Sequence, residues 1–198
     1  MHCLITACIA GAACAVASSA AAGVKVSVKT DHYEISGKSG EALVNAMDRK
    51  GPKHGFLTRA IAQTRYEVAW DLEWTEKAGK CRVRKVAGDL DITYIYPKVG
   101  GALDPALRKR WARFLSGVRK HEETHGAIAR QMVAAAERAI ARISTTGDPG
   151  CVKIRNEVKR RVNGIYAEYE AKQVRFDEIE HRDGGNVEKM VVSLLKKR

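Results

Sequence analysis

The sequence predicts an α+β fold in which a small antiparallel sheet packs against a long antiparallel helical hairpin. Up to about residue 103, β-branched and aromatic residues alternate with polar ones, whereas the later residues are rich in Ala, Arg, Lys and Glu with helical periodicity. The segments before that change are joined by connections too short for crossovers, which favours antiparallel pairing. We therefore expect one domain over residues 23–198, mainly β over 23–103 and mainly α over 104–198.

The β-rich part has clear punctuation between its elements. Alternating apolar and polar residues predict strands in four segments: residues 24–28, 33–35, 64–74 and 82–96. Ser39 is a good N-cap for a helix that extends to Arg49. Gly79 predicts a turn between the last two strand segments, and Gly88 predicts a β-bulge inside the final one.

The α-rich part contains two long helices. Asp104 is a suitable N-cap for the first helix, with Pro105 as its first residue. This helix is expected to extend to about Ser144, where the segment 146–150 stops it. The second helix is expected from about Val152 into the 170s. Because the connection between them is short, the two helices should pack as an antiparallel pair.

Composition and charge limit the kinds of partner. The chain has 198 residues, 45% of them apolar and 29% charged, which excludes a disordered chain. Its formal net charge of +12 favours binding to an anionic partner such as an envelope surface. More often, however, such an excess of basic residues only forms a solvent-exposed face without a specific partner. No nucleic-acid recognition motif is present, so we expect no nucleic-acid partner. Because no apolar run after residue 22 approaches about 20 residues, we expect no transmembrane segment in the mature chain.

The N-terminal segment is typical of a signal peptide. Residues 1–22 contain no Lys, Arg, Asp or Glu, and an apolar stretch over residues 4–17 precedes the small residues 18–22. We expect cleavage after Ala20 or Ala22 and export to the periplasm or the extracellular space. The alternative is that this segment forms a buried first helix of the domain.

Export would leave two cysteines in the mature chain, Cys81 and Cys151. In an exported protein a single pair permits one connectivity, so we expect these residues to form a disulfide. The alternative is two free, buried thiols.

The motif His121-Glu122-Glu123-Thr124-His125 is an H-E-x-x-H sequence on the first long helix. Residues four apart on a helix lie one turn apart on the same side, so both imidazoles could bind one zinc ion. Glu122 is rotated by roughly 100° from His121, which would let it act as general base toward a metal-bound water. In a chain with 6 His, roughly 0.01 chance matches are expected.

His121, Glu122 and His125 lie on the same face of the helix as its apolar residues. This face should point toward the core. Burying His121, His125 and Glu122 without partners would cost a few kcal/mol for each group. A bound metal ion or a solvent cleft would remove that cost. The alternative is a hydrogen-bonded polar cluster without metal.

A catalytic zinc site needs a third protein ligand. In an antiparallel pair, the second helix returns level with the motif at about residue 173, and His181 lies only slightly beyond. We predict His181 as the third ligand, on a chain that leaves the helix and folds back. The alternatives are three acidic residues: Asp177, Glu180 and Glu170. Three residues could stabilise an oxyanion, and the sequence does not choose among them: Tyr166, Tyr169 and Arg175.

The order and spacing of several segments resemble a known family. They are residues 33–37, 64–70, Cys81, Trp111, 121–125, Cys151 and 176–181. Together they are similar to the bacterial domain-of-unknown-function 922 family, whose members are described as predicted secreted zinc-dependent proteases. The resemblance covers about residues 30–185. Phe176, Ile179 and Arg182 stand where that family usually has Tyr, Thr and Gly.

The sequence thus predicts an exported zinc-dependent metallopeptidase that acts on peptides or proteins. His121, His125 and His181 are the predicted zinc ligands and Glu122 the predicted general base. One alternative is a non-catalytic metal-binding envelope protein. Another is a basic module that binds anionic envelope polymers.

Overall fold

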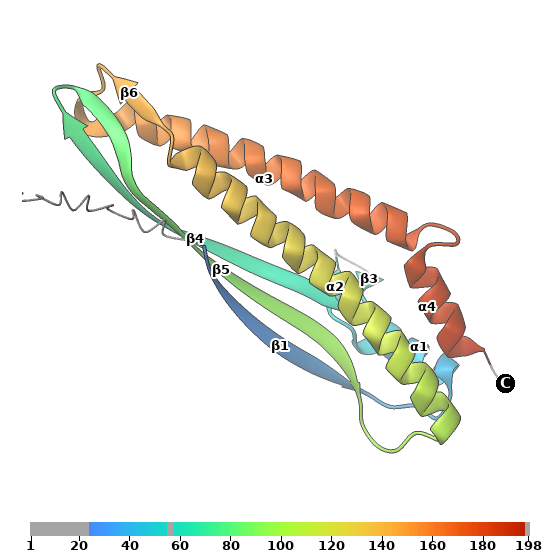
Figure 1. Ribbon diagram of the computed structural model, residues 1–198. Helices are drawn as coiled ribbons and strands as arrows, with labels where there is room; N and C mark the ends of the chain where they lie inside the picture. Colours follow the sequence, from blue (N-terminus) through green and yellow to red (C-terminus); the bar gives the residue numbers. More distant parts are fainter. Residues whose placement is uncertain (1–23, 55–57, 197–198) are drawn as a thin grey trace, which may run out of the picture.

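The computed structural model describes residues 24–54 and 58–196, so the predicted signal peptide lies outside the described residues. Its strands are β1 (Lys25–Ile35), β2 (Lys53–His54), β3 (Thr58–Arg59), β4 (Gln63–Lys77), β5 (Lys80–Val99) and β6 (Ser144–Thr146). Its helices are α1 (Gly40–Lys50), α2 (Pro105–Ile140), the short 3-10 helix η1 (Pro149–Cys151), α3 (Val152–His181) and α4 (Asn186–Leu195). The predicted α+β class is confirmed (Figure 1).

The long β-hairpin of β4 and β5 is the central feature of the sheet. Its two-residue turn, Ala78–Gly79, has positive φ at both positions, 51° and 70°, as a type I′ turn requires. The sheet order is β1-β5-β4, and β6 pairs with the first residues of β5. Strand β5 therefore lies between β1 and β4 and is the central strand of the sheet.

The expectation of a wholly antiparallel sheet is wrong at β1, which pairs with β5 in parallel along its whole length. Between β1 and β4 the chain passes through α1 and the β2–β3 pair. Strand β4 does not pair with β1, and the position between them is left empty. The tight turn after β4 then brings β5 into that vacant middle position. The expectation of two short strands is also wrong here, because β1 is one continuous strand.

Gly88 does not form the predicted bulge. It pairs regularly with Trp70, and the register shift lies between Glu73 and Trp74. Close packing explains the glycine instead, since a Cβ at position 88 would lie 2.8 Å from Val133 Cγ1 and 3.0 Å from the Trp70 ring. The absence of a side chain at this position lets α2 approach the sheet.

The main core lies between β5 and α2. Alternate residues of β5 from Leu90 to Tyr96 are buried on one face of the sheet. Helix α2 presents a matching buried stripe: Leu107, Trp111, Phe114, Val118, Ala129, Met132 and Val133. Each large apolar side chain contributes roughly 1.5–3 kcal/mol when fully buried. This packing holds His121 and Glu122, in the middle of the stripe, toward the interior.

The predicted helix starts are confirmed. Ser39 accepts a hydrogen bond from a backbone N–H in the first turn of α1, and Asp104 accepts two in the first turn of α2, at 2.9 and 3.0 Å. Helix α2 ends at Ile140 rather than near Ser144. The chain leaves the helix early because residues 144–146 join the sheet as β6.

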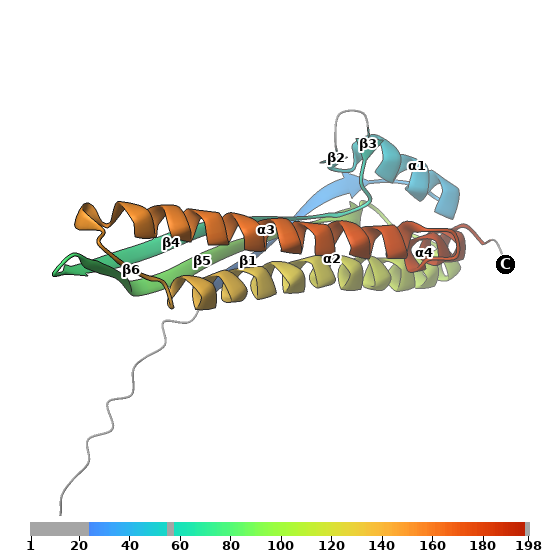
Figure 2. The same ribbon diagram turned by 90° about the horizontal axis from the view of Figure 1, so that it is seen from above.

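Helix α3 runs beside α2 in the opposite direction, and after a bend α4 lies next to the N-terminal half of α2 (Figures 1 and 2). The indole Nε1 of Trp70 on β4 donates to the hydroxyl of Tyr166 on α3 at 2.8 Å. Leu194 of α4 is fully buried against this assembly. Within residues 24–54 and 58–196, no helix is both long and apolar enough to cross a lipid bilayer.

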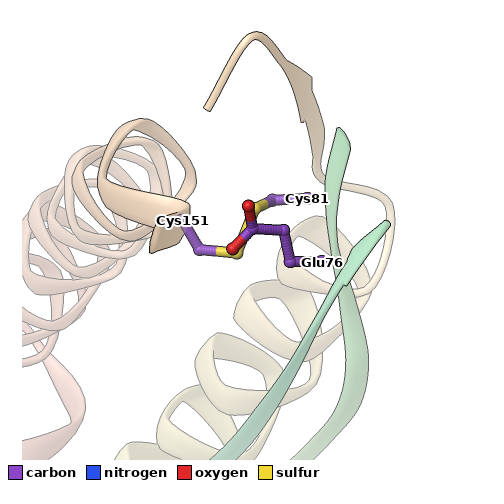
Figure 3. Close-up of side chains that lie close together, drawn as sticks. All are labelled: Glu76, Cys81 and Cys151. Carbon is purple, nitrogen blue, oxygen red and sulfur yellow. A yellow bond between two sulfur atoms is a disulfide. The ribbon is translucent and has the colours of Figure 1, made fainter. Parts of the chain in front are cut away.

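The predicted disulfide is confirmed. Cys81, near the start of β5, is bonded to Cys151, directly before α3, across a sequence separation of 70 residues (Figure 3). The carboxylate of Glu76 lies beside the disulfide and accepts a hydrogen bond from the backbone N–H of Gly150 at 3.1 Å. The disulfide thereby fixes the beginning of α3 to the tip of the hairpin.

Asp148 is a second anchor at the same end. Its fully buried carboxylate accepts hydrogen bonds from the Thr145 hydroxyl and from the backbone N–H groups of Lys153 and Ile154. Burial alone would raise the pKa of Asp148, but these hydrogen bonds hold it below its ordinary value of 3.8. The carboxylate thus acts as a cap for the first turn of α3.

The double variant Cys81→Ala/Cys151→Ala should be less stable than the parent by about 4 kcal/mol, because a 70-residue loop is no longer closed in the unfolded chain. Urea unfolding of both proteins measures the difference. Reductant should bring the parent to the level of the variant. Equal unfolding midpoints without reductant would contradict the prediction.

Asp148→Asn should lower the melting temperature at neutral pH by several degrees. Because the folded-state pKa of Asp148 is lowered, its charge stabilises the fold above pH 3.8 and this contribution disappears as the pH falls through the folded-state pKa. Melting curves of parent and variant should therefore converge in acid. A difference that stayed constant from neutral pH to well below pH 3.8 would be inconsistent with this role.

Candidate functional site

Two histidines of α2 and one aspartate of α3 bring together three atoms of the kind that bind metal ions, which are called donor atoms below. The Nε2 atoms of His121 and His125 lie 3.2 Å apart. Oδ1 of Asp177 lies 3.2 Å from the first and 2.9 Å from the second. His181 lies next to this group, since single donor atoms of His121, Asp177 and His181 all lie within 4.8 Å of one another.

Helical spacing explains how both helices present these side chains. On α2, His121 and His125 are four residues apart and lie on one side. On α3, Asp177 and His181 are also four residues apart, and α3 passes α2 at this level. His181 is the last residue of α3, so it reaches the group from within the helix and the expected fold-back of the chain is wrong.

Glu180 and Glu170, the other two acidic alternatives for the third ligand, lie at different distances from the histidine pair. Glu180 Oε2 lies 3.8 Å from Nδ1 of His121, while its Oε1 accepts a hydrogen bond from Asn186. Glu170 is exposed and lies seven residues before Asp177, roughly 10 Å along the helix axis. Asp177 is therefore the acidic group nearest to the histidine pair.

Gln173 fixes the orientation of the His125 ring. Its amide Nε2 donates to the backbone carbonyl of His125 at 3.2 Å, which leaves its Oε1 to accept from His125 Nδ1 at 2.5 Å. The proton on Nδ1 directs the lone pair of Nε2 toward Asp177. Sequence reasoning missed Gln173, although its spacing of four residues from Asp177 places both on the same stripe of α3.

This arrangement concentrates lone pairs that require a positive charge. The Nε2 atom of His125 faces both a carboxylate oxygen and the Nε2 atom of His121. Burial lowers the pKa of His125, but hydrogen bonds to Asp177 and Gln173 outweigh this effect and raise it overall. Burial acts to raise the pKa of Asp177, and the two histidines hold it well below its ordinary value. A proton or a metal cation would satisfy the group.

The donor set fits a zinc ion. A tetrahedral zinc ion with Zn–N bonds of about 2.05 Å places its donors roughly 3.3 Å apart. The three separations among His121, His125 and Asp177, from 2.9 to 3.2 Å, are close to that value. Nδ1 of His121 is buried without a hydrogen-bond partner among the described residues, and the Phe176 ring stacks on this imidazole at 4.9 Å.

Glu122 is buried and anchored rather than free. Its Oε2 accepts a hydrogen bond from the hydroxyl of Thr64 on β4 at 2.7 Å, and the same hydroxyl lies 3.0 Å from the Glu122 carbonyl oxygen. The neighbouring Glu123 is exposed. Thr64 is a second residue that sequence reasoning missed, because a contact between a strand and a helix 58 residues away leaves no local pattern.

A pocket of about 440 Å³ opens beside His121 between α2, the end of α3 and α4. Phe114 and Phe176 supply apolar walls, and Lys120 and Glu180 supply charged ones. The pocket gives one side of the candidate site access from the surface.

The three residues considered as oxyanion stabilisers have other contacts. The hydroxyl of Tyr166 accepts its hydrogen bond from Trp70. The Lys172 ammonium lies over the Tyr169 ring at 3.8 Å from its centroid. Arg175 is exposed on α3.

Comparison with known proteins gives one match. The chain matches no curated protein and no solved structure. A family model described as "Bacterial protein of unknown function (DUF922)" matches residues 30–185, which include both cysteines of the disulfide and every donor described above. The chain therefore belongs to this bacterial family of unknown function, DUF922.

Proposed function

We propose that the protein is an exported zinc-dependent metallopeptidase. The observation that carries the proposal is the convergence of His121 Nε2, His125 Nε2 and Asp177 Oδ1 within 3.2 Å of one another, next to a buried glutamate. Such a group of donors is suited to a divalent cation. The pocket beside His121 offers a path for a peptide substrate.

In this proposal His121 and His125 hold zinc together with one donor from the end of α3. His181, the ligand predicted from the sequence, and Asp177 are the two residues within reach. Two imidazoles with either a third imidazole or a carboxylate are ligand sets of catalytic zinc sites, and both leave a position open. Zinc, when bound, would supply a lowered pKa for water and polarisation of the scissile carbonyl.

Glu122 would serve as the general base in peptide-bond hydrolysis. Its carboxylate would accept a proton from the attacking water and return it to the leaving amine. The hydrogen bond from Thr64 holds the carboxylate in one orientation, which reduces the entropy lost at the moment of reaction. Gln173 plays a similar orienting part for His125.

Export is part of the same proposal. The charge-free, apolar residues 1–22 are typical of a signal peptide, and a disulfide forms and persists in oxidising compartments. Both features support a periplasmic or extracellular location.

A non-catalytic metal-binding envelope protein is the second candidate, and the number of donors favours it specifically. If Asp177 and His181 both bound the metal with the histidine pair, four protein ligands would fill a tetrahedral site. Such a closed site stabilises a fold without activating water.

Glu122→Gln should keep zinc and lower hydrolysis of a peptide library by at least roughly 100-fold, because a general base contributes about 10²–10⁴ in rate. The matched control is Glu123→Gln, which changes the exposed neighbour and should retain parental activity. Zinc content by elemental analysis and cleavage by mass spectrometry are the measurements. Parental cleavage by the Glu122→Gln variant would refute the proposed mechanism.

The variants Asp177→Ala and His181→Ala distinguish a zinc site with three protein ligands and one open position from a closed site with four protein ligands. For a peptidase with three ligands, one variant should bind zinc at least roughly tenfold more weakly and the other should stay near the parent. Competition with a fluorescent zinc chelator measures the affinities. Strong weakening in both variants, together with no cleavage by the parent, would favour the non-catalytic candidate.

A further inference from the structure

Two pockets lie next to each other along α2 and α4, and together they are called the groove below. The pocket beside His121 and a second one of about 770 Å³ share three lining residues: Arg113, Lys189 and Ser193. The second pocket extends toward the N-terminal end of α2, where Ala106 lines it. The groove therefore leads from the outer end of α2 to the candidate site.

The charged residues that line the groove are mainly basic. Six of its lining residues are basic: Lys109, Arg110, Arg113, Lys120, Lys189 and Lys196. Its two acidic lining residues already accept hydrogen bonds, Glu180 from Asn186 and Glu188 from the backbone N–H of Gly184. Six basic residues against two acidic ones give the lining a positive formal net charge.

Direct contact with an acid does not neutralise these cations. A few basic residues elsewhere do pair with acids, as Lys85 does with Asp71 and Arg161 with Glu157. Over residues 24–54 and 58–196, none of the six groove cations lies within 4.0 Å of an acidic oxygen. The Nε atom of Arg110 is also buried without a hydrogen-bond partner there. Unpaired charge along a concave wall attracts anions more strongly than a solvated flat face does.

The spacing fits an extended chain. Lys109 and Lys120 are eleven residues apart on α2, or roughly 16 Å along the axis. An extended peptide covers this distance with about five residues. Alternate side chains of such a peptide point to the same side, so two or three acidic residues could face the cations.

We infer that this groove binds an acidic segment of about five residues in the peptide substrate, and thereby directs the neighbouring bond to His121 and Glu122. The cleavage part of this inference rests on the proposed function, whereas the binding part does not. A peptide fits better than single-stranded nucleic acid, because the aromatic lining residues, Phe114 and Phe176, belong to the inner pocket, whereas five of the six cations line the outer pocket, where no lining residue offers a ring for a base to stack on.

The test measures binding of a fluorescein-labelled penta-glutamate peptide by anisotropy, in the otherwise unchanged chain and in Glu122→Gln. The groove variant is Lys109→Gln/Arg113→Gln/Lys189→Gln, three exposed residues of the groove. The control variant is Arg138→Gln/Arg155→Gln/Lys159→Gln, which removes the same charge from exposed positions near the opposite end of the two long helices.

The groove variant should bind the peptide about tenfold more weakly, and the control variant should bind as the parent does. A penta-glutamine peptide should bind much more weakly than penta-glutamate. Equal losses in both triple variants, or tighter binding of a single-stranded oligonucleotide at the same salt, would overturn the inference. If penta-glutamate binds selectively but no acidic peptide is cleaved, the proposed peptidase function fails while the groove assignment holds.

Discussion

The contact of Asp177 with the two histidines depends on the register of α3 along α2. A shift of one residue would turn α3 by roughly 100° and move its side chains by about 1.5 Å along the axis, so the carboxylate would leave both imidazoles. The disulfide and the Asp148 cap set this register at the start of α3. The site is thus held from a distant end of the helix, by groups that take no part in it.

Local signals in the sequence predicted much of this arrangement. The cap at Asp104 and the apolar stripe of α2 predict which face of the helix holds the motif. The antiparallel arrangement of the two helices predicts that residue 173 lies level with the motif, and Gln173 contacts His125 there. The parallel pairing of β1 could not be predicted, because alternation of side chains is the same in parallel and antiparallel strands. Thr64 escaped notice for a related reason, since its partner lies on a separate element.

The sequence predicts either a metal site or a hydrogen-bonded cluster for the polar residues on the buried face of α2, and the geometry links the two explanations. Neutral partners satisfy part of the cluster: Thr64 for Glu122 and Gln173 for His125. The Asp177 oxygen and the two Nε2 atoms still require a positive charge between them. A proton would therefore compete with the proposed metal ion for the same place, and the affinity for that metal would depend on pH.

Helix α4 turns one side of α2 into a wall of a groove, and its own position depends on α1. Gly40, at the start of α1, permits this contact, since a Cβ there would lie 2.2 Å from the carbonyl oxygen of Leu194. The buried Leu194 side chain then holds α4 beside the cations of α2. The region between β1 and β4, which decides the unusual strand order, thus also supports the surface that leads to the candidate site.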